Sequence, residues 1–188
     1  VRVVTNRSSG KMGFRLAEAA WERGAEVTLI TGPVSLPAPV GVSLVTVETT
    51  AQMEAAVGAA LPETDLLIMA AAPADYRPAE TAGAKRPRQE GPLTVALEPT
   101  DDILRRTAGL RKPGSVIVGF ALETGDAVAK GRAKLGRKQL DLIVVNDALE
   151  PGAAFEVDTN RVVILDRDGG ERIVPLASHH VSRANAEG

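Results

Sequence analysis

The sequence predicts an α/β protein with a doubly wound, mostly parallel, Rossmann-like sheet. Segments with strand patterns alternate with segments with helix patterns from residue 14 to residue 145. Residues 66–72 are apolar without interruption, which is typical of a strand buried on both faces. The chain of 188 residues can form one domain with a sizeable core, so we expect a single domain over residues 1–188.

The individual elements follow from local patterns. Apolar residues at helical spacing predict a helix over residues 14–23, which the pair Arg23 and Gly24 ends. Thr50 is expected to cap a second helix that runs to about residue 60. The other expected elements are strands at residues 25–30, 42–47, 66–72, 116–120 and 142–145, and a helix at residues 124–138.

Two segments break the alternation of strand and helix. Residues 93–97 read as an exposed or antiparallel strand, and residues 161–174 read as a hairpin turning at Asp168, Gly169 and Gly170. One interpretation is a small antiparallel extension that pairs with another subunit. The other is an antiparallel edge on the main sheet.

Composition excludes several classes of function. A net charge of −2 argues against general affinity for nucleic acid or membranes. The absence of cysteine excludes disulfides, thiolate nucleophiles and cysteine-based zinc sites, and makes the cytoplasm the expected location. The two histidines, His179 and His180, lie in a polar tail and are expected to be exposed to solvent.

Residues 6–13 (NRSSGKMG) form a candidate anion site. Ser8 or Ser9 can cap the helix that follows, and Gly10 and Gly13 let another molecule approach the backbone. The free N–H groups of the first turn and the positive end of the helix dipole favour a phosphate or a carboxylate there. The alternative is an ordinary capped first helix.

Polar or aromatic residues follow three expected strands, where an open parallel sheet binds its ligands. They are Asp75, Phe120, Glu123, Asn146 and Asp147. Asp75 and Asp147 are equally readable as turn or capping residues, and Phe120 as part of the core.

Two common phosphate motifs are excluded. A P-loop needs a hydroxyl residue after its glycine and lysine, but Met12 follows Gly10 and Lys11 here. The dinucleotide fingerprint needs a glycine where this chain has Ser8. An NAD-type site is therefore not expected.

Taken together, five segments resemble bacterial phosphopantothenoylcysteine synthetase, the C-terminal half of a bifunctional coenzyme A biosynthesis protein. The match runs in order from the first residue to about residue 176 and is specific as a set. The segments are residues 6–13, 32–37 (GPVSLP), 70–77 (AAAPADYR), 119–124 (GFALET) and 134–147 (KLGRKQLDLIVVND).

The resemblance implies a ligase that joins 4′-phosphopantothenate to cysteine through an acyl-cytidylate made from CTP. It further implies Mg2+ with the CTP, no FMN on this chain, a homodimer, and fusion to or association with a decarboxylase half. A nucleotide- or phosphate-binding module without catalysis is the alternative. The family also has a first strand ahead of Val1 and a longer C-terminal helix, so we expect this chain to lack both, with residues 1–5 as a loop rather than a strand.

The resemblance also assigns roles to individual residues. Asn6 would hold the acyl-cytidylate, and Lys85 would close on the triphosphate from a mobile basic loop over residues 78–91. Phosphopantothenate would be bound by Arg2, Asn6, Ser8, Ser9 and Gly10. CTP would be bound by Met69, Ala70, Ala71, Asp75, Lys85, Asp101, Asp102, Ile103, Leu104, Phe120, Lys134 and Lys138.

Three points within these assignments depend on the residue type. Asp75 would meet the ribose or the metal, and Lys134 and Lys138 would face the phosphates from one side of a helix. Pro87 and Arg88 depart from the lysine-rich family loop, and Asp101 stands where the family has proline.

Overall fold

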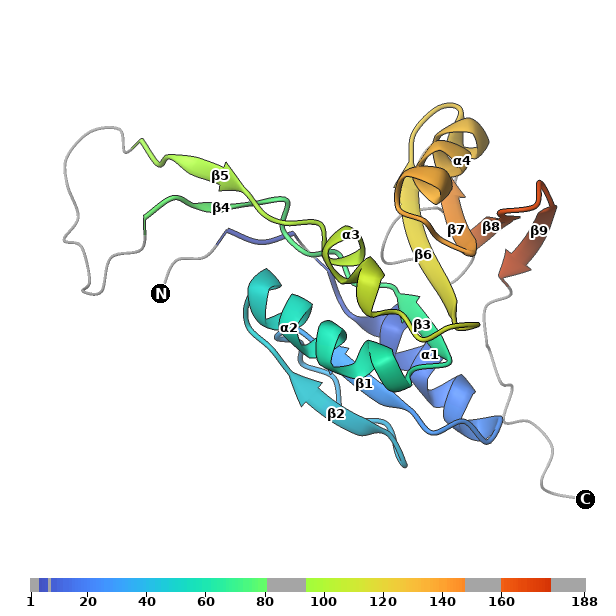
Figure 1. Ribbon diagram of the computed structural model, residues 1–188, viewed down its shortest axis with the longest axis horizontal. Coiled ribbons are helices and arrows are strands. Elements are labelled where there is room, and N and C mark those ends of the chain that lie inside the picture. Colours follow the sequence, from blue (N-terminus) through green and yellow to red (C-terminus); the bar gives the residue numbers. More distant parts are fainter. Residues whose placement is uncertain (1–3, 7, 81–93, 148–159, 177–188) are drawn as a thin grey trace, which may run out of the picture. The chain divides into compact units, whose positions relative to one another are not determined.

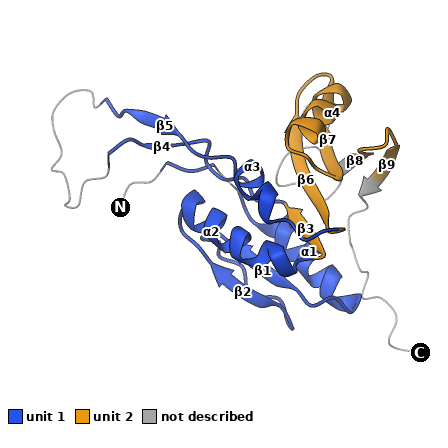
Figure 2. Cartoon of the chain, viewed as in Figure 1, with its two compact units in different colours: residues 1–64, 70–113 blue, residues 65–69, 114–188 orange. Residues whose placement is uncertain are grey.

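The computed structural model describes residues 4–6, 8–80, 94–147 and 160–176 of the chain. Contacts divide the chain into two compact units (Figures 1 and 2). Unit 1 comprises residues 1–64 and 70–113, and unit 2 comprises residues 65–69 and 114–188. Each unit has its own sheet and its own helices, and each is described below by itself.

Unit 1 begins with helix α1 (Lys11–Glu22), which leads into strand β1 (Thr28–Thr31). Strand β2 (Ser43–Thr46) pairs with β1 in parallel, in the register Thr28 to Ser43. Helix α2 (Thr50–Ala60) follows, and both α1 and α2 contact β1. Helix α3 (Ile103–Thr107) packs on α2.

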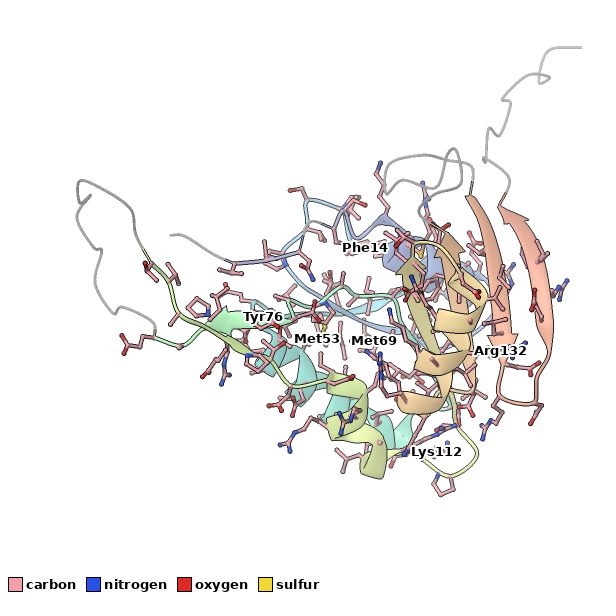
Figure 3. All side chains as sticks on the ribbon, turned by 90° about the horizontal axis from the view of Figure 1, so that it is seen from above. Phe14, Met53, Met69, Tyr76, Lys112 and Arg132 are labelled. Carbon is pink, nitrogen blue, oxygen red and sulfur yellow. The ribbon has the colours of Figure 1, made fainter. Side chains whose placement is uncertain are left out.

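The core of unit 1 forms where these helices meet the strands. Phe14 on α1 and Met53 on α2, both labelled in Figure 3, are 8% exposed. Gly58 lets α2 and the segment after α3 approach closely, because an added Cβ would lie 3.3 Å from Leu110 Cδ1. The short helical turns η1 (Leu61–Glu63) and η2 (Ala108–Leu110) extend α2 and α3. Burial of these apolar faces holds the helices in place.

An antiparallel arm completes unit 1. Strand β4 (Tyr76–Pro78) pairs with β5 (Leu97–Pro99), and Figure 1 shows this arm reaching away from α2 and α3. Residues 94–96 are not strand, so the strand expected at residues 93–97 begins later than predicted, at Leu97. Arg77 and Glu98 face each other across the arm, with Nε and Oε1 2.7 Å apart.

Unit 2 contains a five-stranded sheet in the order β3-β6-β7-β8-β9. Strands β3 (Leu66–Met69), β6 (Val116–Glu123) and β7 (Leu142–Asp147) are parallel. Strands β8 (Asn160–Asp166) and β9 (Glu171–Leu176) form the predicted hairpin, and β8 joins β7 antiparallel. The mostly parallel α/β architecture is therefore confirmed, and the hairpin is an antiparallel edge of the main sheet.

Helix α4 (Ala127–Arg137) covers β6, β7 and β8. Gly131 permits this contact, since an added Cβ would lie 2.5 Å from Val145 Cγ2. At the opposite end of β7, the buried Asp141 accepts a 2.7 Å hydrogen bond from the Ile117 backbone N–H and pairs with Arg167. This carboxylate ties the starts of β6 and β7 together.

Three local expectations were wrong. Strand β3 is not buried on both faces: Leu66 is 51% exposed because β3 is the edge strand of its sheet. Thr49, not Thr50, caps α2, through a capping box in which Thr49 Oγ1 accepts from Gln52 N. Helix α1 begins at Lys11 rather than at residue 14, because Gly10 already takes the cap position.

Candidate functional site

Helix α1 starts from a left-handed glycine. Gly10 is the N-cap, with φ of 73°, a conformation that glycine adopts without steric cost. The hydroxyls of Ser8 and Ser9 accept from Gly10 N and Lys11 N at 3.4 Å. The N-cap residue itself, Gly10, makes no side-chain capping bond. The expectation that Ser8 or Ser9 caps α1 was therefore wrong, because both precede the cap position.

The start of α1, where the sequence predicts an anion site, is exposed to solvent. The first N–H groups of a helix point along its axis, and the helix dipole gives that end a partial positive charge. Ser8, Ser9 and Lys11 are exposed there, and Gly13 has open space where a Cβ would stand. An anion can thus approach the backbone of the first turn closely.

Three segments of unit 1 meet at the loop after residue 72. The Asn6 side-chain amide donates to the Pro73 carbonyl at 2.9 Å. Thr100 donates its hydroxyl to the Ala74 carbonyl at 2.6 Å and its backbone N–H to the Asp75 carbonyl at 2.9 Å. These bonds connect the segment before α1, the loop that carries Asp75 and the segment before α3.

Several predicted site residues therefore lie on joined segments of unit 1. Asn6, Ala71, Asp75 and Asp101 are exposed, and Ala70 is half-buried. Their polar groups and backbone are available to a ligand, which is what a nucleotide site needs.

Residues 102–104 mainly stabilise the start of helix α3 and the core of unit 1. Asp102 Oδ1 caps α3 by accepting from Arg105 N at 3.4 Å. Ile103 and Leu104 are 4% and 7% exposed, so their side chains belong to the core. A nucleotide contact from Ile103 or Leu104 would have to come from the backbone.

The remaining described nucleotide candidates lie in unit 2. Phe120 on β6 and Met69 on β3 are half-buried. Lys134 Nζ lies 2.5 Å from Glu123 Oε1, so the lysine charge is already paired at the carboxyl end of β6. Lys138 is the C-cap residue of α4, at the far end of the helix from its N-terminus.

Two further polar groups lie at that end of the unit 2 sheet, of which sequence reasoning missed Lys130 and singled out Asn146. The Lys130 ammonium donates to the Thr124 carbonyl, which fixes the loop between β6 and α4. Asn146 Oδ1 on β7 is buried and has no hydrogen-bond partner among the described residues. Lys130 lies one helical turn before Lys134, and this spacing was the signal available in the sequence.

Some predicted residues cannot be placed. Arg2, Lys85, Pro87, Arg88 and both histidines lie outside the described residues, so their roles stay predictions. The same holds for most of the expected lid over residues 78–91.

A metal fits only together with a ligand. Within the described ranges, no group of three or more His, Cys, Asp or Glu side chains could hold an ion. Mg2+ usually binds proteins through one or two carboxylates plus substrate phosphates, and the exposed Asp75 suits that arrangement.

A cavity of about 420 Å3 opens at the carboxyl ends of β1 and β2. Sequence reasoning did not predict it, although Gly32, Pro33, Val34 and Leu36 of the segment 32–37 line it. The lining residues are Phe14, Thr31, Gly32, Pro33, Val34, Leu36, Leu44, Thr46, Val47, Glu48 and Gln52.

In the part of the chain that the structure describes, no helix is long and apolar enough to cross a membrane.

The fold and site thus define an α/β protein in which an exposed helix start is joined to a polar strand-end loop. The family model described as the DNA/pantothenate metabolism flavoprotein C-terminal domain matches residues 1–185. The chain belongs to this family.

Individual relatives agree with that assignment. The chain is 45% identical to the coenzyme A biosynthesis bifunctional protein CoaBC of Bacillus subtilis (strain 168), over 95% of this chain and 44% of the relative. It is 44% identical, over 89% of its length and 47% of the relative, to a protein of an unknown prokaryotic organism named cysteine/cysteine sulfinic acid decarboxylase. The chain thus spans less than half the length of these relatives.

A solved structure extends the likeness to three dimensions. The crystal structure of the C-terminal domain of the coenzyme A biosynthesis bifunctional protein CoaBC is 37% identical, with a TM-score of 0.76. The match covers 94% of this chain and 79% of that one.

Proposed function

We propose that this protein ligates 4′-phosphopantothenate to cysteine at the expense of CTP, giving 4′-phosphopantothenoylcysteine, CMP and pyrophosphate. Family membership and the coenzyme A biosynthesis relatives support the pathway. The observation that carries the proposal is the 2.9 Å hydrogen bond from Asn6 to Pro73. It joins residues 6–13, the anion loop, to the segment that carries Ala70, Ala71 and Asp75.

The first half-reaction activates the carboxylate. A carboxylate oxygen of phosphopantothenate attacks the α-phosphorus of CTP, and the bond to the pyrophosphate oxygen breaks. The work of the protein is to align these groups and to balance their negative charge. The backbone N–H groups at the start of α1 and basic side chains of the chain balance the negative charge of these groups. Mg2+, when bound with the triphosphate, supplies further charge neutralisation.

The second half-reaction forms the amide. The amine of cysteine attacks the acyl carbon, the bond to the CMP oxygen breaks, and the amine gives up a proton. Asn6 is proposed to hold the acyl-cytidylate through its amide, and Arg2 and Lys85 are proposed to bind the phosphates. The phosphate-binding roles of Arg2 and Lys85 are inferred from the family resemblance alone. No thiol of the protein is needed, which fits a chain without cysteine.

The assay that tests this proposal follows pyrophosphate and CMP. With CTP, phosphopantothenate and cysteine, we expect one CMP and one pyrophosphate for each product molecule. Pyrophosphate should also appear without cysteine, up to the amount of enzyme, and ATP in place of CTP tests the nucleotide preference. Nucleotide binding without any pyrophosphate would favour a non-catalytic binding module instead.

We also propose a homodimer in the cytoplasm, fused to or associated with a decarboxylase half. The match covers less than half the length of these relatives, which supports the second half. Two exposed apolar side chains offer surface that a second subunit can cover. They are Val95 beside β5, which is 52% exposed, and Ile173 on β9, which is 49% exposed. Val95→Glu should shift the protein toward monomer in analytical ultracentrifugation. Val163 is a less clean test because it pairs with Val145 inside the sheet.

A further inference from the structure

The cavity at the carboxyl ends of β1 and β2 has no role in the mechanism described so far. Its lining comes entirely from unit 1: from α1, the two strand ends, the loop after β1 and the start of α2. In an open parallel α/β sheet, this is the edge at which ligands bind. The volume of about 420 Å3 suits a small molecule.

The chemistry of the lining selects the kind of ligand. Phe14, Val34 and Leu36 supply apolar surface, and Thr31 supplies a hydroxyl near the strand end. Among the described residues that line the cavity, Glu48 is the one ionisable side chain. A carboxylate in such surroundings attracts a cation and repels a phosphate or a triphosphate. The cavity therefore matches a ligand with a positive charge and a small apolar part.

A rigid frame holds Glu48 at this position. The Gln52 side-chain oxygen accepts from the backbone N–H of Glu48 at 2.8 Å and from that of Thr49 at 3.0 Å. Thr49 Oγ1 accepts in return from Gln52 N at 3.2 Å. This capping box fixes the backbone of Glu48 against the first turn of α2, so its carboxylate is attached to an ordered segment.

The cavity shares a wall with the anion loop. The backbone of Gly10 lies against the Val34 side chain, since a Cβ on Gly10 would stand 2.9 Å from Val34 Cγ1. One turn further into α1, the backbone N–H of Phe14 donates to the Gly10 carbonyl at 3.1 Å. Phe14, on α1, and Val34, on the loop after β1, thus line the cavity next to Gly10, which belongs to the segment at which the acyl-cytidylate is proposed to form.

We propose that this cavity binds the amine substrate, cysteine, with its ammonium group at Glu48, its thiol-bearing side chain against Phe14 and Val34, and its carboxylate directed away from Glu48 toward the open side of the cavity. A polarisable sulfur makes favourable contacts with an aromatic ring. The inference rests on the proposed function, because it concerns the second substrate of that reaction. It names a binding site for cysteine that is distinct from the anion-binding start of α1.

The test compares Glu48→Gln with Glu26→Gln, an exposed glutamate of unit 1 that does not line the cavity. Glu48→Gln should raise the KM for cysteine about fivefold, as expected for one partly exposed ion pair. Glu26→Gln should leave it unchanged. Thr46→Phe, which fills the cavity from an exposed strand end, should raise the same KM further. Melting temperatures verify that each variant is folded.

Direct binding gives a readout that does not depend on turnover. Cysteamine keeps the ammonium of cysteine, whereas 3-mercaptopropionate keeps the carboxylate and lacks the ammonium. Ligand-detected NMR should show cysteamine binding to the parental protein and weaker binding to Glu48→Gln, and no binding of 3-mercaptopropionate at the same concentration.

The outcomes separate the inference from the proposed function. If pyrophosphate is released without cysteine but Glu48→Gln and Thr46→Phe keep the parental KM for cysteine, the inference is overturned and the ligase stands. Binding of 3-mercaptopropionate as tight as that of cysteamine would also overturn it. If the parental protein releases no pyrophosphate under any condition, the ligase proposal is the one that fails.

Discussion

Helices α1 and α4 begin in opposite ways. Helix α4 is capped by Asp126, whose Oδ1 accepts from Ala129 N at 3.0 Å, and side chains likewise cap α2 and α3. Helix α1 starts from the left-handed Gly10 with no side-chain cap. A cap satisfies N–H groups that a bound anion would otherwise use. Of these four helices, α1 is therefore the one at whose start we propose that an anion binds.

The glycines inside the same two helices also differ, in how tightly their surroundings pack against the helix backbone. A Cβ added at Gly131 of α4 would stand 2.5 Å from Val145 Cγ2, whereas one added at Gly13 of α1 would meet nothing within 4 Å. A glycine inside a helix costs about 1 kcal/mol relative to alanine. Packing of α4 on the sheet accounts for Gly131, and packing does not account for Gly13. The difference teaches that a glycine in a helix can serve the fold or the ligand, and that its surroundings decide which.

The largest expected effect is that of Asn6→Asp. A carboxylate cannot donate to the Pro73 carbonyl, and it brings a negative charge to the anion loop. We expect the first half-reaction to proceed and the second to stall, with overall turnover reduced by about 100-fold or more. Mass spectrometry should detect the accumulated acyl-cytidylate.

Thr5→Val is the matched control for that substitution. Thr5 is the exposed neighbour of Asn6 and bonds only to its backbone carbonyl, at 3.2 Å, among the contacts of the described residues. This variant should keep parental turnover. Product formation by Asn6→Asp at the parental rate would show that Asn6 does not hold the intermediate.

Gly10→Ala should destabilise the start of α1. Alanine at φ of 73° is strained, and its Cβ would lie 2.9 Å from Val34 Cγ1. Together these effects should lower the free energy of unfolding by about 2–4 kcal/mol, measured by urea denaturation. In a double-mutant cycle, Val34→Ala should relieve the contact but not the strain, a coupling of about 1 kcal/mol. Purely additive effects would contradict the contact.

The paired variants Gly131→Ala and Gly136→Ala test the packing half of the comparison. Both positions lie in α4, but a Cβ at Gly136 would meet nothing within 4 Å. Gly131→Ala should destabilise the protein by about 1–3 kcal/mol because it overpacks the contact with Val145. Gly136→Ala should stabilise it by about 0.5–1 kcal/mol. Equal effects at the two sites would mean that α4 does not pack on the sheet at Gly131.

The smallest change in stability is expected for Gly13→Ala. The added methyl group has open space, so the melting temperature should rise slightly through better helix propensity. If a ligand approaches the backbone there, the KM for phosphopantothenate or CTP should rise at the same time. A more stable variant with unchanged KM values would remove Gly13 from the ligand site.

The sequence predicted the fold well where local pattern and tertiary contacts agree. The β8–β9 hairpin was predicted from its turn residues Asp168, Gly169 and Gly170, and the end of α1 from Gly24, whose φ is 86°. The burial of residues 66–72 was mispredicted, because an apolar run does not reveal that β3 is an edge strand. The cap of α2 was displaced by one residue because two threonines stand side by side at 49 and 50.

The candidate site was predictable in its polar loops but not in its cavity. Asn6 and Asp75 were singled out because they precede a helix or follow a strand. The pairing of Lys134 with Glu123 was not, since it depends on how α4 lies over β6. The cavity with Glu48 was missed because its lining comes from five separate segments, and no local pattern predicts a void between them.

The transfer of a carboxylate oxygen tests the central claim most directly. Phosphopantothenate labelled with heavy oxygen in its carboxylate is converted with CTP and cysteine, and the nucleotide product is analysed by mass spectrometry. If the carboxylate attacks the α-phosphorus, one labelled oxygen appears in the phosphate of CMP. Formation of product with CDP and labelled inorganic phosphate would contradict the account, because the carboxylate would then have attacked the γ-phosphorus and activation would pass through an acyl phosphate.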